Sequence, residues 1–207
     1  ESEAVSVTAI EKDERSTVAL RELEEAYPGR LKIIAADALE TNLAELVPAP
    51  RKIVSNLPYN IGTPLLLNWL RQAREWESMT LMFQKEVADR LAAQPGSKAY
   101  GRLAIITQWL CDVRSEFNVS PKAFTPPPKV SSSVITLQPR AEPLAPARWE
   151  ALEKITRAAF GQRRKMLRTS LKSLNLNLEA MDINPTARAE ELEISQFCAL
   201  ARALDET

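Results

Sequence analysis

The chain has 207 residues, which is long enough for one α/β domain of ordinary size with a smaller appendage. Its 45% hydrophobic and 26% charged residues are typical of a soluble globular protein, and its 27 basic and 27 acidic residues give a net charge of zero. It has no histidine, and its five glycines form no phosphate-binding cluster, which excludes histidine-dependent triads, histidine-ligated zinc and a P-loop.

The first hundred residues alternate between apolar, β-branched runs and amphipathic stretches. The runs predict strands at residues 5–10, 31–35, 52–55 and 79–83, and the amphipathic stretches predict helices at 13–26, 64–74 and 87–93. Strands that alternate with helices at this spacing indicate an α/β fold with a mainly parallel sheet and right-handed crossovers. In such a sheet, ligands bind at the carboxyl ends of the strands.

The second half predicts a hairpin followed by an all-helical segment. After a helix at 102–110, strands at 113–119 and 133–137 are bridged by a proline-rich loop at 124–129, because proline cannot donate to a strand ladder. Residues 141–146 predict a linker, and everything after Ala147 predicts helix. We therefore predict a catalytic domain over residues 1–140 and a small all-α domain over residues 147–207.

Three polar residues stand at or just past the ends of successive predicted strands. They are Glu11, Asp37 and Asn56. Each alone is explained as a helix cap or a turn residue, which Asp and Asn both favour. Their repetition at equivalent positions indicates a ligand site at one edge of the sheet.

The tetrapeptide Asn56-Leu57-Pro58-Tyr59 suits the alkylation of an exocyclic amino group of adenine. That nitrogen is a poor nucleophile because its lone pair is delocalised into the ring. The Asn56 side-chain oxygen and the Leu57 carbonyl, held rigid by Pro58, can accept both N–H bonds and free the lone pair. Tyr59 offers an aromatic face for an unstacked base. The alternative is a turn that merely ends a strand.

The two cysteines, Cys111 and Cys198, are far apart and match no metal-ligand spacing. We expect both to be small apolar core residues, which suits a reducing cytoplasm, and we predict no metal site. No apolar run reaches the roughly 20 residues that a membrane helix needs.

Six segments together resemble the KsgA-type ribosomal RNA adenine dimethyltransferases. In chain order they are A-I-E-K-D at 9–13, A-D-A-L at 36–39, S-N-L-P-Y-N-I-G at 55–62, F-Q-K-E-V at 83–87, F-T-P-P-P-K-V-S-S-S at 124–133 and F-G-Q-R-R-K-M-L-R at 160–168. The resemblance covers nearly the whole chain. It implies a Rossmann-like fold and dimethylation of N6 on two adjacent adenines near the 3′ end of small-subunit (16S) ribosomal RNA, with S-adenosylmethionine as methyl donor.

The resemblance also implies a cofactor site. Glu11 corresponds to the acid that accepts hydrogen bonds from the cofactor ribose, with Lys12 beside it. Asp37 corresponds to the contact to the amino group of the cofactor adenine, with the backbone near Ala38 reading the ring. Asn56 belongs to both the cofactor site and the target site.

The target base is expected to be sandwiched between Tyr59 and Phe124. The alternative for Phe124 is a core phenylalanine beside a proline turn. Extrusion of the base is physically necessary, because the target nitrogen otherwise lies inside a stack or a pair.

The family also has a first strand and a glycine-rich loop upstream of the acid corresponding to Glu11. Only ten residues precede Glu11 here, so that segment lies outside this chain. We expect the full-length protein to contain it, and we expect the chain as given to bind the cofactor weakly or not at all.

A run of basic residues without acids extends from Arg157 to Lys172. It predicts a basic helix that contacts RNA phosphates, with Arg163, Arg164, Lys165 and Arg168 as the candidate residues. The alternative is an ordinary solvated helix face. On the RNA-binding interpretation, residues 147–207 form a helical RNA-binding domain.

The sequence hypothesis is therefore a cytoplasmic, monomeric ribosomal RNA adenine dimethyltransferase whose partner is the immature 30S subunit. Three alternatives remain open at this point: a related large-subunit ribosomal RNA methyltransferase, a DNA adenine methyltransferase, and a ribosome-assembly or transcription factor that binds RNA without catalysis. The basic segment argues against the first, the lack of a separate target-reading domain against the second, and the intact Asn56 and Tyr59 against the third.

Overall fold

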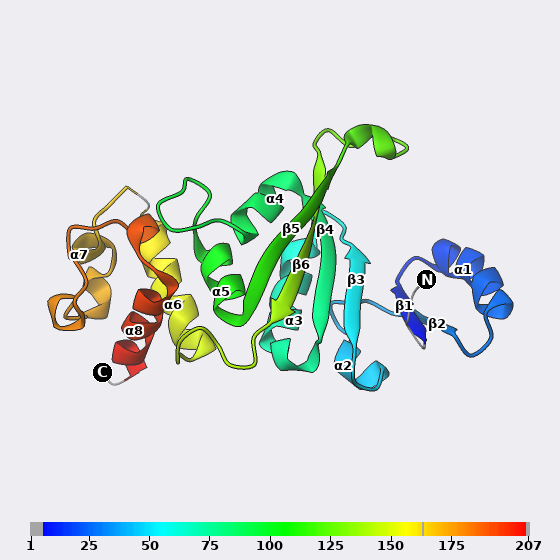
Figure 1. Cartoon of the computed structure of the whole chain (residues 1–207), viewed down its shortest axis with the longest axis horizontal. Coiled ribbons are helices and arrows are strands. Elements are labelled where there is room, and N and C mark those ends of the chain that lie inside the picture. Colours follow the sequence, from blue (N-terminus) through cyan, green and yellow to red (C-terminus); the bar gives the residue numbers. More distant parts are fainter. Residues whose placement is uncertain (1–5, 163, 206–207) are drawn as a thin grey trace.

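The computed structural model describes residues 6–162 and 164–205 (Figure 1). The strands are β1 Val7–Glu11, β2 Leu31–Ala35, β3 Lys52–Asn56, β4 Ser78–Gln84, β5 Cys111–Val119 and β6 Ser132–Pro139. The helices are α1 Glu14–Ala26, α2 Leu43–Leu46, α3 Gly62–Arg71, α4 Lys85–Leu91, α5 Arg102–Leu110, α6 Trp149–Gly161, α7 Leu167–Ser170 and α8 Ile194–Asp205. None of the helices in these described ranges has the length and apolar character needed to cross a membrane.

The strands form two sheets rather than one. β1 and β2 pair in parallel with each other, and a second sheet has the order β3-β4-β6-β5. Only β3 and β4 are parallel in that second sheet, because β5 and β6 form a hairpin and add to β4 as antiparallel strands. The α/β class is as predicted, and the four strands of the first hundred residues pair in parallel as expected, but they lie in two sheets, and the predicted hairpin adds antiparallel strands to the second.

The β1-α1-β2 unit is thinly packed and lies beyond the β3 edge of the larger sheet in Figure 1. Asp13 caps α1 by accepting a hydrogen bond from the Arg15 amide at 2.8 Å, which satisfies one of the free donors of the first turn. Val18 and Leu23 on α1 are nevertheless exposed, at 65% and 48%.

The main core lies between the four-stranded sheet and the helices that cover it, and it continues without a break into the C-terminal helices. Leu66 of α3, Leu81 of β4 and Leu152 of α6 are all completely buried in this one cluster. Buried Tyr100 also donates from its hydroxyl to the Leu192 carbonyl at 3.1 Å. The division between residues 1–140 and 147–207 therefore stays a prediction, and the two parts share apolar packing.

The C-terminal segment has long helices only at its two ends, so the expectation of helix throughout was wrong. Between α6 and α8, the described chain forms α7, of four residues, and single 3₁₀ turns. Asn175 and Asp182 adopt left-handed conformations, with φ of 51° and 55°, and each ends a turn. The basic run is also not one helix, because α6 ends at Gly161 and α7 begins at Leu167.

Candidate active site

The ends of β1 and β2 bring three of the predicted cofactor residues together. Glu11 pairs with Ala35 in the parallel ladder, so the two strands end side by side. The Lys12 ammonium donates to Asp37 Oδ2 at 2.6 Å across the two strand ends. Glu11 Oε1 accepts from the Asp13 amide at 2.8 Å, which turns the chain into α1.

The charge on Asp37 is stabilised by its neighbours. The hydrogen bond from Lys12 and a second one from the Leu39 amide, at 2.9 Å, hold the pKa of the Asp37 carboxyl below its ordinary value. The same hydrogen bond and charge raise the pKa of Lys12. Asp37 therefore presents an ionised carboxylate, an acceptor that can receive hydrogen bonds from an amino group.

These residues fit the nucleoside part of S-adenosylmethionine. Glu11 Oε2 makes no hydrogen bond within the described residues, so it can accept from ribose hydroxyls. The Asp37 oxygens carry further lone pairs for an amino group, and half-buried Ala38 follows in the same loop. The individual cofactor roles of Glu11, Lys12, Asp37 and Ala38 stay predictions.

The predicted target-base tetrapeptide forms a fixed turn at the end of β3. Asn56 is the last residue of β3, and the Leu57 amide continues the ladder by donating to the Met82 carbonyl at 3.3 Å. The Pro58 carbonyl accepts from the Gly62 amide at 2.9 Å, which starts α3. Leu57 is buried at 2%, whereas Asn56 is exposed and makes no side-chain hydrogen bond to any described residue. The turn thus fixes the backbone and leaves the Asn56 amide group available.

Gly62 supports this turn in a way that the sequence does not reveal. A Cβ atom at Gly62 would lie 3.2 Å from Cε1 of Phe83 and 3.3 Å from Cβ of Leu57. The start of α3 therefore packs directly against β4 and against the buried side chain of the tetrapeptide. The glycine was visible in the sequence motif, but no local signal indicated which side chains crowd it.

Tyr59 is tied to the hairpin by a contact that the sequence analysis also missed. Its hydroxyl lies 3.1 Å from Oγ of Ser132, the buried first residue of β6. Tyr59 as a whole remains 47% exposed, so the hydroxyl has a partner although the residue is not buried. Phe124 is half-buried and directly follows the 3₁₀ turn Pro121–Ala123 in the loop of the same hairpin. The sandwich of a base between Tyr59 and Phe124 stays a prediction.

Few contacts join the predicted cofactor residues to the predicted target-base residues. β1 and β2 share no ladder with β3. A hydrogen bond of 3.4 Å from Asn68 of α3 to the Leu39 carbonyl joins the loop after Asp37 to the helix that follows the tetrapeptide. Glu11, Lys12 and Asp37 are thus one group, and Asn56, Leu57, Pro58 and Tyr59 are another.

The basic residues of the C-terminal segment differ from one another. Arg164, Lys165 and Arg168 are exposed and have no ion pair with any described residue, whereas Arg157 pairs with Glu153 at 3.0 Å. Arg163 lies outside the described residues. The first three are therefore available for phosphate contacts, and their assignment to RNA stays a prediction.

The cysteines lie in the core and not at this site. Cys111 and Cys198 are both completely buried. Burial raises the pKa of the Cys111 thiol to about 12 and that of Cys198 to about 11. Thiols with such pKa values are protonated at neutral pH and are poor nucleophiles.

The family model described as ribosomal RNA adenine dimethylase matches residues 2–206 of this chain. The chain belongs to the ribosomal RNA adenine dimethylase family. "Ribosomal RNA small subunit methyltransferase A" of Paramagnetospirillum magneticum is 63% identical over 98% of this chain and 73% of that protein. The protein of the same name from Rhodospirillum rubrum is 58% identical over 96% of this chain and 70% of that protein.

Two solved structures resemble this member of the family over 97% of its length. A dimethyladenosine transferase from Plasmodium falciparum superposes with a TM-score of 0.82 at 25% identity, with 82% of that chain covered. The 23S rRNA methyltransferase ErmE superposes with a TM-score of 0.68 at 26% identity, again with 82% of that chain covered. The match agrees with the expected methyltransferase fold.

Proposed function

We propose that this chain carries out the S-adenosylmethionine-dependent dimethylation of adenine N6 in small-subunit ribosomal RNA. The observation that carries the proposal is the exposed Asn56 at the end of β3, followed three residues later by Tyr59, whose hydroxyl contacts Ser132. Family membership and relatives named as small-subunit methyltransferases support the same reaction. The resemblance adds two adjacent adenines near the 3′ end of that RNA as the specific target.

In the proposed mechanism, two acceptors activate the amino group of adenine. The Asn56 side-chain oxygen and the Leu57 carbonyl accept its two N–H bonds, so the nitrogen lone pair is turned out of the ring. The hydrogen bonds from the Leu57 amide to Met82 and from the Gly62 amide to Pro58 hold the backbone of the turn, including the Leu57 carbonyl, in place before the base arrives. A preorganised acceptor of this kind does not need to rearrange during the reaction.

Tyr59 and Phe124 are the proposed base clamp. The hydrogen bond to Ser132 fixes the orientation of the Tyr59 ring, and fixing a stacking surface reduces the entropy lost when the base stacks. S-adenosylmethionine supplies an electrophilic methyl group, and Glu11 and Asp37 would hold its ribose and adenine. The methylated nitrogen is transiently cationic and loses its proton readily to water, so no histidine base is required.

The catalytic proposal is preferred over the three alternatives. A non-catalytic RNA-binding factor has no use for an exposed Asn56 at the end of β3 followed three residues later by Tyr59. ErmE shares the fold, but its TM-score of 0.68 is lower than the 0.82 of the dimethyladenosine transferase. The relatives at 58–63% identity carry small-subunit names, which does not favour large-subunit RNA or DNA as the substrate.

We also propose that the protein acts as a monomer on the immature 30S subunit in the cytoplasm. The exposed cations Arg164, Lys165 and Arg168 supply phosphate contacts for a folded RNA surface.

The test is transfer of a labelled methyl group by the full-length protein to four substrates in parallel. These are immature small subunits, large subunits, naked ribosomal RNA and DNA. We expect label in small-subunit RNA, recovered as N6,N6-dimethyladenosine after digestion. Label only in large-subunit RNA or in DNA would reject the substrate, and no transfer to any of them would reject the activity.

A further inference from the structure

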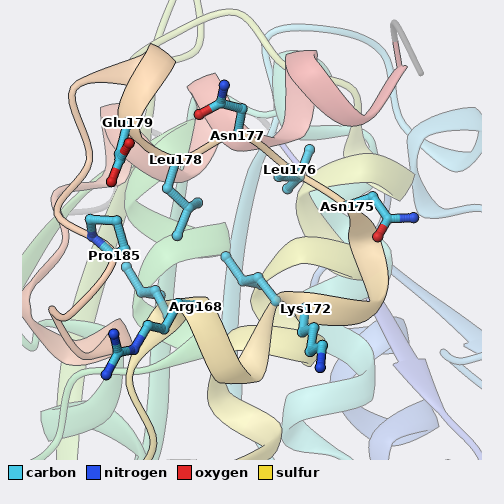
Figure 2. A pocket seen from close by; sticks show the side chains of 10 residues that line it. Arg168, Lys172, Asn175, Leu176, Asn177, Leu178, Glu179 and Pro185 are labelled. Carbon is cyan, nitrogen blue, oxygen red and sulfur yellow. The ribbon is translucent and has the colours of Figure 1, made fainter.

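A groove in the C-terminal segment has no role in the reaction described above. Its cavity of about 270 Å³ lies between the α7 region and the chain from Asn175 to Glu179. This is just below the roughly 300–1,000 Å³ of typical small-molecule sites, so it can hold one ring system but not a folded segment. Figure 2 shows Arg168 and Lys172 on one wall and Asn177 and Leu178 on the other.

The inside of the groove is apolar. Leu167, Leu171 and Leu178 form buried parts of the lining, and Leu176 and Pro185 are half-buried. In Figure 2, Leu178 points from its wall toward the wall that carries Arg168 and Lys172. An apolar surface of this kind accepts the flat face of a ring and cannot satisfy a buried charge.

The rim of the groove is positively charged on the α7 side. In Figure 2 the charged ends of Arg168 and Lys172 point away from the opposite wall, so their alkyl stems border the groove and their charges stay outside. Neither cation has an ion pair with a described residue, and no acid occurs in the sequence from Gly161 to Leu178. Glu179 is the acidic residue on the opposite wall.

In Figure 2, the amide ends of Asn175 and Asn177 on the opposite wall point away from the groove. Asn175 projects from a left-handed backbone conformation, and Asn177 accepts a hydrogen bond from the Ala180 amide at 3.2 Å through its oxygen. That hydrogen bond fixes the Asn177 side chain and leaves its NH₂ group as a donor. An apolar groove with two cations on its rim that pair with no described acid matches a base and its flanking phosphates.

We propose that this groove binds one unpaired nucleotide of the substrate RNA, with its base in the apolar inside of the groove and its flanking phosphates on Arg168 and Lys172. The proposal rests on the proposed ribosomal RNA substrate. It assigns a second contact point far in sequence from the tetrapeptide, so the groove positions the RNA and takes no part in methyl transfer.

The experiment measures binding of the full-length protein to single-stranded hexaribonucleotides with bases and to an abasic backbone of equal charge. We expect the hexamers with bases to bind several-fold more tightly than the abasic backbone, because stacking and burial act only on the base. A hexamer that contains 4-thiouridine should photo-crosslink to the peptide spanning residues 167–178. Equal binding of the two ligands would show phosphate contacts alone and would overturn the proposal.

Two variants separate the contribution of the cationic rim from that of the apolar inside of the groove. Arg168→Gln with Lys172→Gln should lower the slope of log K against log salt by about 1.4, because each single-strand phosphate contributes about 0.7. Leu176→Gln should remove the preference for bases and leave that slope unchanged. Lys154→Gln is the matched control, since Lys154 is an exposed cation of α6 outside the groove. A double variant that binds like this control would overturn the proposal.

Methyl transfer and thermal unfolding, measured on the same variants, distinguish the remaining outcomes. If the protein methylates small-subunit RNA but crosslinks elsewhere, the groove proposal fails and the proposed function stands. If no RNA is methylated but the base-dependent crosslink persists, the proposed function fails instead. If Leu176→Gln unfolds, Leu176→Met replaces it. Binding is then followed by the fluorescence of a 2-aminopurine base placed in the hexaribonucleotide. A lack of fluorescence change on binding of wild type would then count against a base inside the groove.

Discussion

The unit before β3 and the body from β3 onward differ sharply in how they are packed. Among the described residues 6–46, Thr17 is the single buried one, and Val7 is 51% exposed. From Ile53 onward, one continuous apolar core runs through the four-stranded sheet and both long C-terminal helices. Glu11 and Asp37, the predicted cofactor acids, thus lie on the thinly packed unit before β3. The predicted target-base residues lie on the densely packed body from β3 onward. From this difference in burial, we expect the two halves of the site to differ in local stability.

The largest expected effect tests this difference in packing with the same substitution in each part. Leu81→Ala removes a completely buried side chain of β4, so the free energy of unfolding should fall by about 2–5 kcal/mol. Leu23→Ala, in exposed α1, should change it by less than about 0.5 kcal/mol. Urea unfolding followed by circular dichroism measures both. Similar losses for the two variants would show that the unit before β3 is packed as tightly as the body.

The second prediction concerns catalysis by the residues at the end of β3, in the densely packed part of the chain. Asn56→Ala should lower kcat roughly 100- to 1,000-fold, because one of the two proposed acceptors is lost. Since Asn56 is exposed and makes no described side-chain hydrogen bond, thermal stability and RNA affinity should stay near wild type. Asn60→Ala, an exposed amide four residues later, is the control and should retain activity. A parallel loss of activity and fold in Asn56→Ala would indicate a structural role instead.

The third prediction concerns the ion pair between Lys12 and Asp37, which joins the chain just after β1 to the chain just after β2. The pKa of Asp37 should lie below its ordinary value in the wild type and rise toward it in Lys12→Met, as followed by NMR titration of the carboxyl carbon. Because the folded pKa is lowered, this contribution is fully present above the unfolded pKa of about 3.9 and is lost as the pH falls through the folded value. An identical titration in both proteins would remove Lys12 as the cause.

The smallest expected effect concerns the hydrogen bond between the Tyr59 hydroxyl and Ser132. Tyr59→Phe removes the hydroxyl that contacts Ser132 and should cost up to about 1 kcal/mol of stability, with a modest loss of activity. Tyr27→Phe removes an exposed hydroxyl that has no hydrogen bond to a described residue, so it should be neutral. Thermal unfolding and steady-state methylation measure the pair. A neutral Tyr59→Phe would mean that the contact does not orient the ring.

Local sequence patterns sufficed for most of the elements. The amphipathic pattern at residues 102–110 gave the bounds of α5, and the polar residue at position 56 did mark the end of β3. Both depend on neighbours a few residues apart, which periodicity records. The α/β class and the family follow from these local features together with the six motifs.

The remaining features depend on residues that are distant in the chain. Tyr59 and Ser132 are 73 positions apart, and no local pattern predicts their contact. The antiparallel addition of β6 to β4 is decided by the packing of the hairpin on the sheet. The short turns between α6 and α8 were read as helix because their apolar spacing is helical, whereas left-handed Asn175 and Asp182 interrupt it.

The close packing at Gly62 limits how this enzyme could be redesigned. Even a methyl group there must displace the Phe83 ring or the Leu57 side chain by a few tenths of an ångström. A shift of Leu57 would also disturb the residue whose peptide oxygen is proposed to select an amino group. A protein engineer who wants the enzyme to accept other bases should therefore leave Gly62 unchanged and vary the hairpin loop around Phe124, where residues 122, 123 and 125–127 are exposed.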